Sequence, residues 1–222
     1  RGTNHAVKTV TRMIRKPGVT HALKGDVRSY FPSIQSDILK SRIRRTIADR
    51  DALWLIDTIV GDETGVPIGA LTSQLFANIY LDPLDHFMTE DLGVPYLRYM
   101  DDFIVTGGSR MELVDVQNEA RRYLRSLALE MNPKSDVIPI SHGVDFCGYR
   151  TFRTKRLPRK RNVKRAKNRV RGLSRAVARG DTDIETYKAT IMSFLGYMKH
   201  CQGYQTTRST LDAAAITHGR GQ

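Results

Sequence analysis

Two adjacent aspartates interrupt an otherwise apolar stretch near the middle of this chain. Residues 99–105 read Tyr-Met-Asp-Asp-Phe-Ile-Val, and two glycines follow at 107 and 108. The pattern predicts a strand, a turn that carries the acids, and a second strand. Unpaired carboxylates are costly to bury, so these acids must lie at a surface turn, form ion pairs or bind a metal ion. From this segment alone, a plain turn and a metal site remain open as interpretations.

A third aspartate, Asp26, ends another apolar segment. Residues 20–27 are expected to form a short buried strand. If the two strands are neighbours, Asp26 and Asp101 face each other at the edge of the sheet. Two carboxylates about 4 Å apart repel by roughly 4 kcal/mol at an effective dielectric constant of 20, and a divalent cation reverses that sign. Mg²⁺ prefers oxygen ligands. Two such ions roughly 4 Å apart would activate an attacking 3′-hydroxyl and hold a leaving pyrophosphate, as phosphoryl transfer requires.

The rest of the chain intersperses helices with strands. Helices are expected over residues 3–15, 35–48, 51–60, 72–88 and 111–127, and Pro83 is expected to bend the fourth of them. One or two strands are expected within residues 136–152, around a turn at Gly143. From about residue 160 the pattern is helical, with an interruption at Gly180. The order of elements indicates an α+β fold with an antiparallel sheet covered by helices on one face.

Positive charge is concentrated in one part of the chain. The formal net charge is +13, and residues 150–180 contain 14 Lys or Arg and no Asp or Glu. Charge of this density repels itself unless a polyanion neutralises it, which indicates nucleic acid as a partner. The alternative is a disordered basic tail or a solvated helix face. Helix-like spacing of Val163, Val170, Leu173 and Val177 favours an ordered helix.

The composition sets further bounds. With 222 residues, 40% of them hydrophobic, the chain suffices for one good core or two small ones. Neither a signal peptide nor an apolar run near the roughly 18 residues of a membrane span is visible, so we expect a soluble, cytoplasmic protein. Cys147 and Cys201 lack CxxC spacing and are interpreted as reduced thiols without a zinc site. Because the chain begins with Arg1 rather than Met, we expect residues to be missing before it.

Five segments together resemble the reverse transcriptase family. Residues 99–102 are similar to its YxDD box, motif C. In family order, residues 26–34 resemble motif A, residues 65–74 motif B, residues 129–134 motif D, and residues 143–149 the primer grip. The resemblance implies a polymerase palm with partial fingers over residues 1–150 and a basic helical thumb over residues 151–222, the N-terminal fingers being truncated. It also implies an RNA-directed DNA polymerase that extends a DNA or RNA primer on an RNA template with deoxynucleoside triphosphates.

The resemblance also implies roles for the acids and a lysine. Asp26 and Asp101 would be the principal ligands of two Mg²⁺ ions, with Mn²⁺ as an alternative metal and the Val27 carbonyl assisting. Asp102 would support the site. Lys134 would lie near the pyrophosphate and protonate it, the alternative being a solvated lysine.

Further roles concern the incoming nucleotide. Phe31 matches the steric gate that rejects a 2′-hydroxyl, and plain core packing is its alternative. In motif B the residues set against the nucleotide would be Ile68, Gly69 and Gln74. This Pro-Ile-Gly and Ser-Gln pattern resembles the reverse transcriptases of bacterial and phage diversity-generating retroelements, in which a branched apolar residue accompanies relaxed fidelity opposite template adenines. Ile cannot donate the hydrogen bonds of the Gln found in many relatives.

Other readings stay open. The nearest are the retron, group II intron and antiviral reverse transcriptases of bacteria. A catalytically inactive, nucleic-acid-binding palm is disfavoured by the intact acids, and a palm-fold nucleotide cyclase would not need the basic region. The thumb would grip an A-form-like hybrid by its backbone and shape. The expected primer and template contacts are Gly148, Tyr149, Arg159, Lys160, Arg161 and Lys164. A basic accessory protein of the retroelement is the further partner that the resemblance implies.

Overall fold

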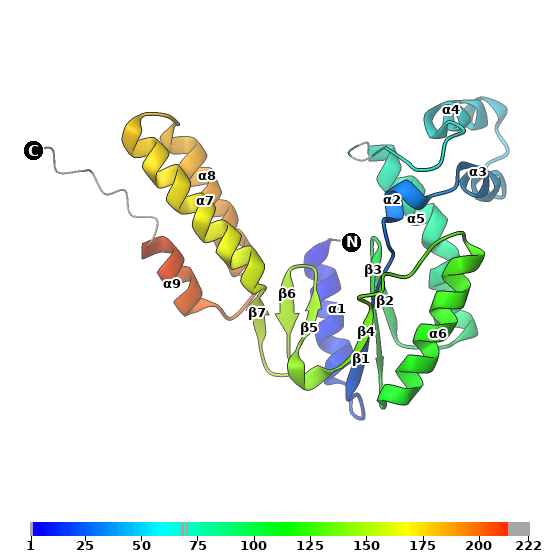
Figure 1. The fold of residues 1–222 in the computed structure, drawn as a ribbon, viewed down its shortest axis with the longest axis horizontal. Helices are drawn as coiled ribbons and strands as arrows, with labels where there is room; N and C mark the ends of the chain where they lie inside the picture. The colour runs from blue at the N-terminus through cyan, green and yellow to red at the C-terminus, as the bar shows by residue number, and fades with distance from the viewer. Residues whose placement is uncertain (1, 68, 70, 213–222) are drawn as a thin grey trace, which may run out of the picture. The chain divides into compact units, whose positions relative to one another are not determined.

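A computed structural model of the chain describes residues 2–67, 69 and 71–212 (Figure 1). Its contacts divide the chain into two units, the first ending at His142 and the second beginning at Gly143. The segment that resembles the primer grip therefore lies in the second unit, whereas the sequence-based boundary stands at residues 150 and 151. In the part of the chain that the structure describes, no helix combines the length and apolar character that crossing a bilayer requires.

The first unit is built on a four-stranded antiparallel sheet with the order β2-β3-β1-β4. The strands are β1 (His21–Asp26), β2 (Tyr96–Tyr99), β3 (Asp102–Gly107) and β4 (Asp136–Pro139). Leu23 of β1 pairs with Val105 on one side and Val137 on the other, and all three side chains are buried. The strand that ends at Asp26 therefore lies in the interior of the sheet, beside β3.

Helices cover both faces of this sheet. The helices of the first unit are α1 (Thr3–Arg15), α2 (Tyr30–Ser33), α3 (Ser36–Arg44), α4 (Arg50–Val60), α5 (Leu71–His86) and α6 (Arg110–Ser126), with the π-helix η1 (Phe87–Asp91) and the 3₁₀ turn η2 (Ile140–His142). Figure 1 shows α1 and α6 on opposite sides of the sheet, α1 against β2 and β3, and α6 against β1, β3 and β4. The expectation that helices cover one face is wrong. The second face is also apolar, with Ala22 and Ile104 fully buried, and it gives the amphipathic α1 a surface to pack on.

Most predicted helices agree with the structure to within a few residues. Helix α3 ends at Arg44, four residues before the predicted end, and the fourth predicted helix changes type before its end. Pro83 lies inside α5, and the regular helix ends at His86 before continuing as η1. Proline lacks the N–H that would bond to the carbonyl four residues earlier, so the α-helical pattern is weakened at this point. The short helix α2 has no counterpart among the predicted elements.

The second unit begins with a three-stranded antiparallel sheet, β5 (Val144–Phe146), β6 (Tyr149–Thr151) and β7 (Arg156–Pro158). Residues 136–152 thus hold three short strands rather than one or two. Gly143, with φ +78, separates β4 of the first unit from β5 of the second. The two-residue loop between β5 and β6 consists of Cys147 and Gly148, both with positive φ, as a type I′ hairpin requires.

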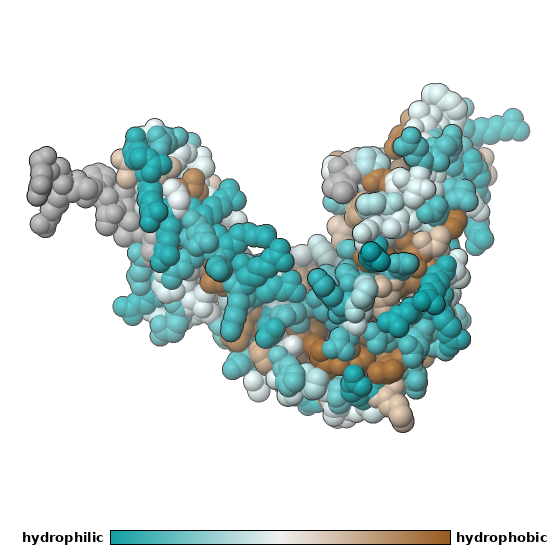
Figure 2. Space-filling model, in the orientation of Figure 1, coloured by the Kyte–Doolittle hydropathy of each residue, from teal (hydrophilic) through white to brown (hydrophobic). Residues whose placement is uncertain are grey.

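Three helices follow: α7 (Lys160–Arg179), α8 (Ile184–Met198) and α9 (Tyr204–Asp212). Helix α7 ends at Gly180 in the left-handed conformation, where the interruption is expected. Its apolar face packs on α8 in a small cluster around the buried Val170 and Tyr187. Figure 2 shows mostly hydrophilic residues on the face of the second unit that is turned to the viewer.

Candidate active site

Asp101 lies in a tight turn between β2 and β3. Tyr99 pairs with Asp102, so Met100 and Asp101 are the two residues of the hairpin loop. Met100 has φ +59, at a loop position where two-residue hairpins favour glycine. A non-glycine residue in this conformation costs about 1 kcal/mol or more and persists only where its surroundings enforce it. Such strain is typical of functional sites.

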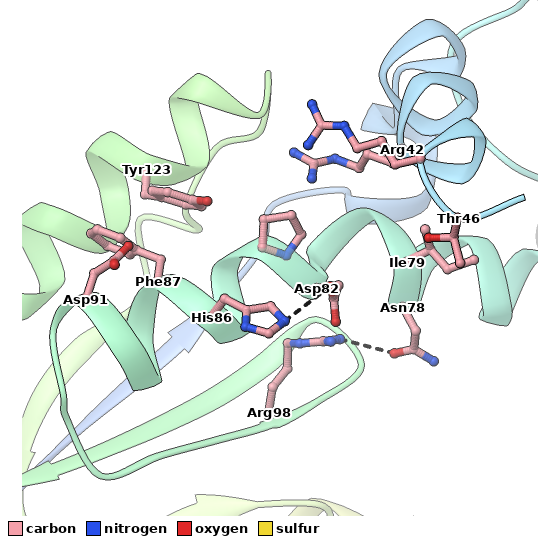
Figure 3. Close-up of a pocket in the computed structure, with 12 residues that line it drawn as sticks. Arg42, Thr46, Asn78, Ile79, Asp82, His86, Phe87, Asp91, Arg98 and Tyr123 are labelled. Atoms are coloured by element: carbon pink, nitrogen blue, oxygen red, sulfur yellow. Dashed lines mark hydrogen bonds and ion pairs between the residues drawn. The ribbon is translucent and has the colours of Figure 1, made fainter.

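Arg98 supplies part of that enforcement. Its Nη1 donates to the Met100 carbonyl at 2.9 Å, while Nε and Nη2 donate to the two carboxylate oxygens of Asp85 at 2.7 and 2.5 Å. The Arg98 side chain is only 10% exposed. Nη1 also donates to Asn78 Oδ1 at 3.1 Å, a contact visible in Figure 3. Since Asp85 and Asn78 belong to α5, the guanidinium ties the turn to that helix.

Asp26 lies beside this turn. It is the register partner of Asp102 in the pairing of β1 with β3. Burial raises the pKa of the Asp101 carboxyl above its usual value, a hydrogen bond from its own backbone lowers it, and the negative charge of Asp26 raises it again. The structure therefore brings Asp26 to the hairpin of Asp101 and Asp102, with Asp26 and Asp101 inside each other's electrostatic field.

The segment after α6 closes around Asp26. Asn132 donates from Nδ2 to Asp26 Oδ2 at 2.6 Å and from its backbone N–H to the Asp26 carbonyl at 2.8 Å. The Asp26 amide donates to Ser135 Oγ at 3.2 Å. Lys134 is exposed, and its backbone N–H donates to Asn132 Oδ1 at 3.0 Å. The predicted proton donor is thus two residues along the chain from a side chain that contacts Asp26.

Val27 forms an isolated antiparallel bridge with Met131. The two hydrogen bonds that flank it run from the Arg28 amide to the Glu130 carbonyl and from the Asn132 amide to the Asp26 carbonyl. Neither bond uses the Val27 carbonyl, the atom predicted to assist in metal binding.

The donor set of these residues suits a hard divalent cation. Asp26, Asp101, Asp102 and the Val27 carbonyl offer oxygen alone. Within the described residues, no group of three or more His, Cys, Asp or Glu side chains forms a ready-made metal cage. Mg²⁺ is usually bound through one or two carboxylates, waters and substrate phosphates rather than by an all-protein cage. The residues present fit an ion that is completed by its substrate.

The segments that resemble motifs A and B also lie together. The Val66 amide donates to the Phe31 carbonyl at 3.0 Å, and the Gly65 amide donates to the Ile34 carbonyl at 2.7 Å. Phe31 is partly buried against the core and meets Tyr30 edge-on, with ring centroids 5.8 Å apart. Its ring thus makes core contacts of the kind that the alternative reading expects.

The other predicted nucleotide contacts lie on or before α5. Gly69 has φ +102, and Gln74 is exposed near the start of the helix. Ile68 lies outside the described residues.

The predicted primer and template contacts lie in the second unit. The Gly148 carbonyl accepts hydrogen bonds from the Arg159 amide at 3.0 Å and from the Tyr197 hydroxyl at 2.5 Å. Tyr149 is buried and stacks on Tyr197, with ring centroids 4.8 Å apart. Gly148 and Tyr149 therefore help to hold the hairpin against α8.

The basic residues at the start of α7 are differently placed. Arg159 approaches Asp145 at 4.0 Å. Lys160, Arg161 and Lys164 are exposed, and among the described residues none of these three forms an ion pair. Their charge is therefore available to an external anion.

Sequence reasoning missed Arg98, Asp85 and the contact of Asn132. A signal for the first was present, since Arg98 stands in the middle of a short aromatic and aliphatic strand, where a buried cation needs a partner. Asp85 lies 13 residues away in the sequence, so its identity as that partner follows only from the fold.

A pocket of about 780 Å³ opens beside α5 (Figure 3). Arg42 of α3 and Arg45, which directly follows that helix, line it together with Asp82, Asp91 and Arg98. None of the predicted site residues is part of its lining. The carboxylates that the sequence singles out therefore lie apart from this pocket.

The sequence of the chain is similar to that of known proteins over most of its length. The family model described as "Reverse transcriptase (RNA-dependent DNA polymerase)" matches residues 2–151. Protein YkfC of Escherichia coli K12 is 25% identical over 202 residues, covering 69% of this chain and 53% of that protein. The Retron Ec73 reverse transcriptase of Escherichia coli is 31% identical over 119 residues, covering 46% of this chain and 37% of that protein. The chain thus spans about half or less of the length of these relatives.

Solved structures share the fold. Apo telomerase from Candida tropicalis matches with a TM-score of 0.58 and 13% identity, covering 96% of this chain and 43% of that one. Telomerase from Candida albicans, in complex with a fragment of telomeric RNA, matches with a TM-score of 0.55 and 12% identity, covering 96% and 49%. At this identity the likeness concerns the fold alone, and it agrees with the expected α+β arrangement of a palm and thumb.

Proposed function

Because this chain belongs to the reverse transcriptase (RNA-dependent DNA polymerase) family, we propose that it extends the 3′ end of a DNA or RNA primer on an RNA template. The observation that carries the proposal is the pairing of Asp26 with Asp102, next to a strained turn that presents Asp101. Three acids drawn from two distant parts of the sequence meet at one end of a sheet.

The acids and the lysine have distinct proposed roles. Asp26 and Asp101, with the Val27 carbonyl, would hold two Mg²⁺ ions, or Mn²⁺ in their place, and Asp102 would support them. When bound, such ions supply activation of the 3′-hydroxyl and charge stabilisation at the leaving pyrophosphate. Lys134 would give a proton to that pyrophosphate, and its exposure leaves it able to move toward a substrate.

The nucleotide contacts are proposed in the same way. Phe31 would lie beneath the sugar of the incoming deoxynucleoside triphosphate and exclude a 2′-hydroxyl. This role is supported by its backbone link to the motif B loop through Val66. Ile68, Gly69 and Gln74 would contact the nucleotide from that loop and from α5.

The second unit would bind the template and primer. Lys160, Arg161 and Lys164 are exposed, and Arg159 lies just before them. Phosphate contacts of this kind release counterions and are insensitive to sequence, which suits an enzyme that must move along its template. Gly148 and Tyr149 would shape the hairpin that faces the primer.

The test uses primer extension by the full-length gene product on an RNA template, with the four deoxynucleotides and Mg²⁺. Asp101→Asn should reduce extension by more than about 100-fold, beyond the usual cost of losing an outer partner of a metal. Binding of a labelled RNA–DNA hybrid should persist. Asp115→Asn, an exposed acid on α6, is the matched control and should extend normally. Full activity of Asp101→Asn would refute the metal role.

The finer proposal is that the enzyme is the error-prone polymerase of a diversity-generating retroelement, encoded by a bacterium or phage, cytoplasmic and assisted by a basic accessory protein. It is supported by Ile68 in the motif B pattern. Ile68→Gln should lower misincorporation opposite template adenines, with Ile59→Gln as the control, and an unchanged error spectrum contradicts it. The retron type is the second candidate, favoured by the 31% identity to a retron reverse transcriptase.

A further inference from the structure

We propose that Asn132 is a positioning residue for the Asp26 carboxylate. The inference rests on the metal role proposed for Asp26 and adds a residue to it. Asn132 is partly buried, and its Nδ2 lies 2.6 Å from Asp26 Oδ2. A short hydrogen bond to one carboxylate oxygen fixes the rotation of the group. This bond leaves the other oxygen, Oδ1, for a cation.

The kind of donor matters as much as its position. Asp85 shows the contrast, because the Arg98 guanidinium binds both of its oxygens and neutralises its charge. An amide is neutral, so Asn132 orients Asp26 and leaves the carboxylate its full negative charge. A carboxylate that is held without being neutralised is suited to a divalent cation.

Asn132 is itself held on every polar atom. Its Oδ1 accepts from the Lys134 amide at 3.0 Å, which turns Nδ2 toward Asp26. Its backbone N–H donates to the Asp26 carbonyl at 2.8 Å, and its carbonyl accepts from the Ser135 amide at 2.9 Å. The next residue, Pro133, has a fixed φ. The side chain thus has one available orientation, and it donates to Asp26 in that orientation.

The same contacts link two parts of the proposed site. One side chain touches Asp26 through Nδ2 and the backbone of Lys134 through Oδ1. The loop that carries the proposed proton donor is therefore placed by reference to the carboxylate that would hold the metal.

The first experiment compares Asn132→Ala with the wild-type full-length protein. Binding of Mn²⁺ alone, followed by electron paramagnetic resonance, should weaken by about 10- to 100-fold, as loss of an outer partner of a metal ligand usually does. The Mg²⁺ concentration for half-maximal primer extension should rise by a similar factor, and excess Mg²⁺ should restore part of the rate. Asn118→Ala, at an exposed position on α6, is the control and should change neither value. Unchanged Mn²⁺ affinity and Mg²⁺ dependence in Asn132→Ala would overturn the proposal.

A second variant separates positioning from loop shape. Asn132→Asp keeps an acceptor for the Lys134 amide and loses the donor to Asp26. If Asn132 served only the loop, this variant would extend primers at the wild-type rate. We expect the rate at saturating Mg²⁺ to fall about tenfold or more, because a second carboxylate would face Oδ2. A wild-type rate would sink the idea, even if Asn132→Ala failed to fold.

Asp26→Asn in the same assays distinguishes failure of the metal role of Asp26 from failure of the positioning role of Asn132. If it retains metal affinity and extension, the metal role proposed for Asp26 fails, and this inference fails with it. If Asp26→Asn is inactive while both Asn132 variants behave as wild type, only the inference about Asn132 is lost.

Discussion

In the first unit, Tyr80, Phe103 and Leu113 are fully buried in one large core, whereas in the second unit α7 and α8 share a small cluster around Val170 and Tyr187. The two units also differ in how their positively charged side chains are paired. Arg98 of the first unit is partly buried and donates to both Asp85 and the Met100 carbonyl, while no described residue forms an ion pair with any basic residue from Lys160 to Arg175. An ion pair fixes the positions of its two side chains, whereas unpaired positive charge on the surface can bind an anion.

The two units differ in how precisely they must place their charged side chains. In the proposed function the first unit holds three acids at one end of the sheet, although Asp26 and Asp101 are close enough to repel each other, and the core on both faces of the sheet supports them. For the phosphate contacts proposed for the second unit, a stripe of positive charge on a stable helix is enough. A polyanion would relieve the self-repulsion of that stripe and would stabilise the unit by mass action.

Binding of an RNA–DNA hybrid by the second unit should depend steeply on salt. If six to ten phosphates are contacted, hybrid affinity should fall by roughly 10³- to 10⁵-fold between about 50 and 200 mM salt. Replacing Lys160, Arg161 and Lys164 together by Ala should reduce the slope of log affinity against log salt by about one per residue. Fluorescence anisotropy of a labelled hybrid measures both quantities. Lys8→Ala, an exposed lysine of the first unit, should leave the slope unchanged. A flat response would remove the contrast between paired and open charge.

The same substitution, Leu to Ala, tests how tightly each unit is packed. Leu113→Ala empties a fully buried site in the first unit and should lower the free energy of unfolding by about 2–5 kcal/mol. Leu173→Ala, at a partly buried position of α7, should cost less than about 2 kcal/mol. Urea unfolding of both variants checks the two values. Equal losses would mean that the second unit is packed as tightly as the first.

Two glycines test the comparison with opposite signs. The Phe103 ring lies where a Gly25 side chain would be, so Gly25→Ala forces a shift in a full core and should cost about 1–3 kcal/mol. Because Gly25 and Phe103 adjoin Asp26 and Asp102, primer extension should also fall. Gly172 has open space around it within α7, and Gly172→Ala should stabilise the helix by about 0.5–1 kcal/mol. Thermal unfolding gives both signs, and a stabilising Gly25→Ala would show that the core has room.

The sequence predicts local secondary structure better than it predicts tertiary contacts. The helical periodicity of residues 3–15, the strand ending at Asp26 and the break at Gly180 all agree with the structure, because local spacing and turn residues determine them. The family and the α+β fold were likewise predictable from ordered motifs. The burial of the second face of the sheet was not predictable, because it depends on the tertiary position of α1.

The contacts that hold the acids were also beyond local reasoning. Asn132 lies 106 residues from Asp26, and nothing in its neighbourhood identifies that partner. Arg98 signals a need for a partner, but three different groups satisfy its guanidinium at once. Such contacts follow from tertiary packing rather than from periodicity.

The Asp183 carboxylate caps the start of α8. Asp183 accepts hydrogen bonds from the Thr186 backbone amide at 2.5 Å and from its hydroxyl at 2.9 Å, and these bonds hold the pKa of the Asp183 carboxyl below its usual value of 3.8. A lowered folded-state pKa gives stability that is present above 3.8 and is lost as the pH falls through the folded value. Asp183→Asn keeps a capping oxygen and removes the charge. Its melting temperature should therefore lie slightly below that of the wild type at pH 7, and the gap should close below pH 3.8. A gap that is the same at every pH would mean that the negative charge of Asp183 does not contribute to the stability of α8. The side-chain oxygen would then cap the helix without help from the charge.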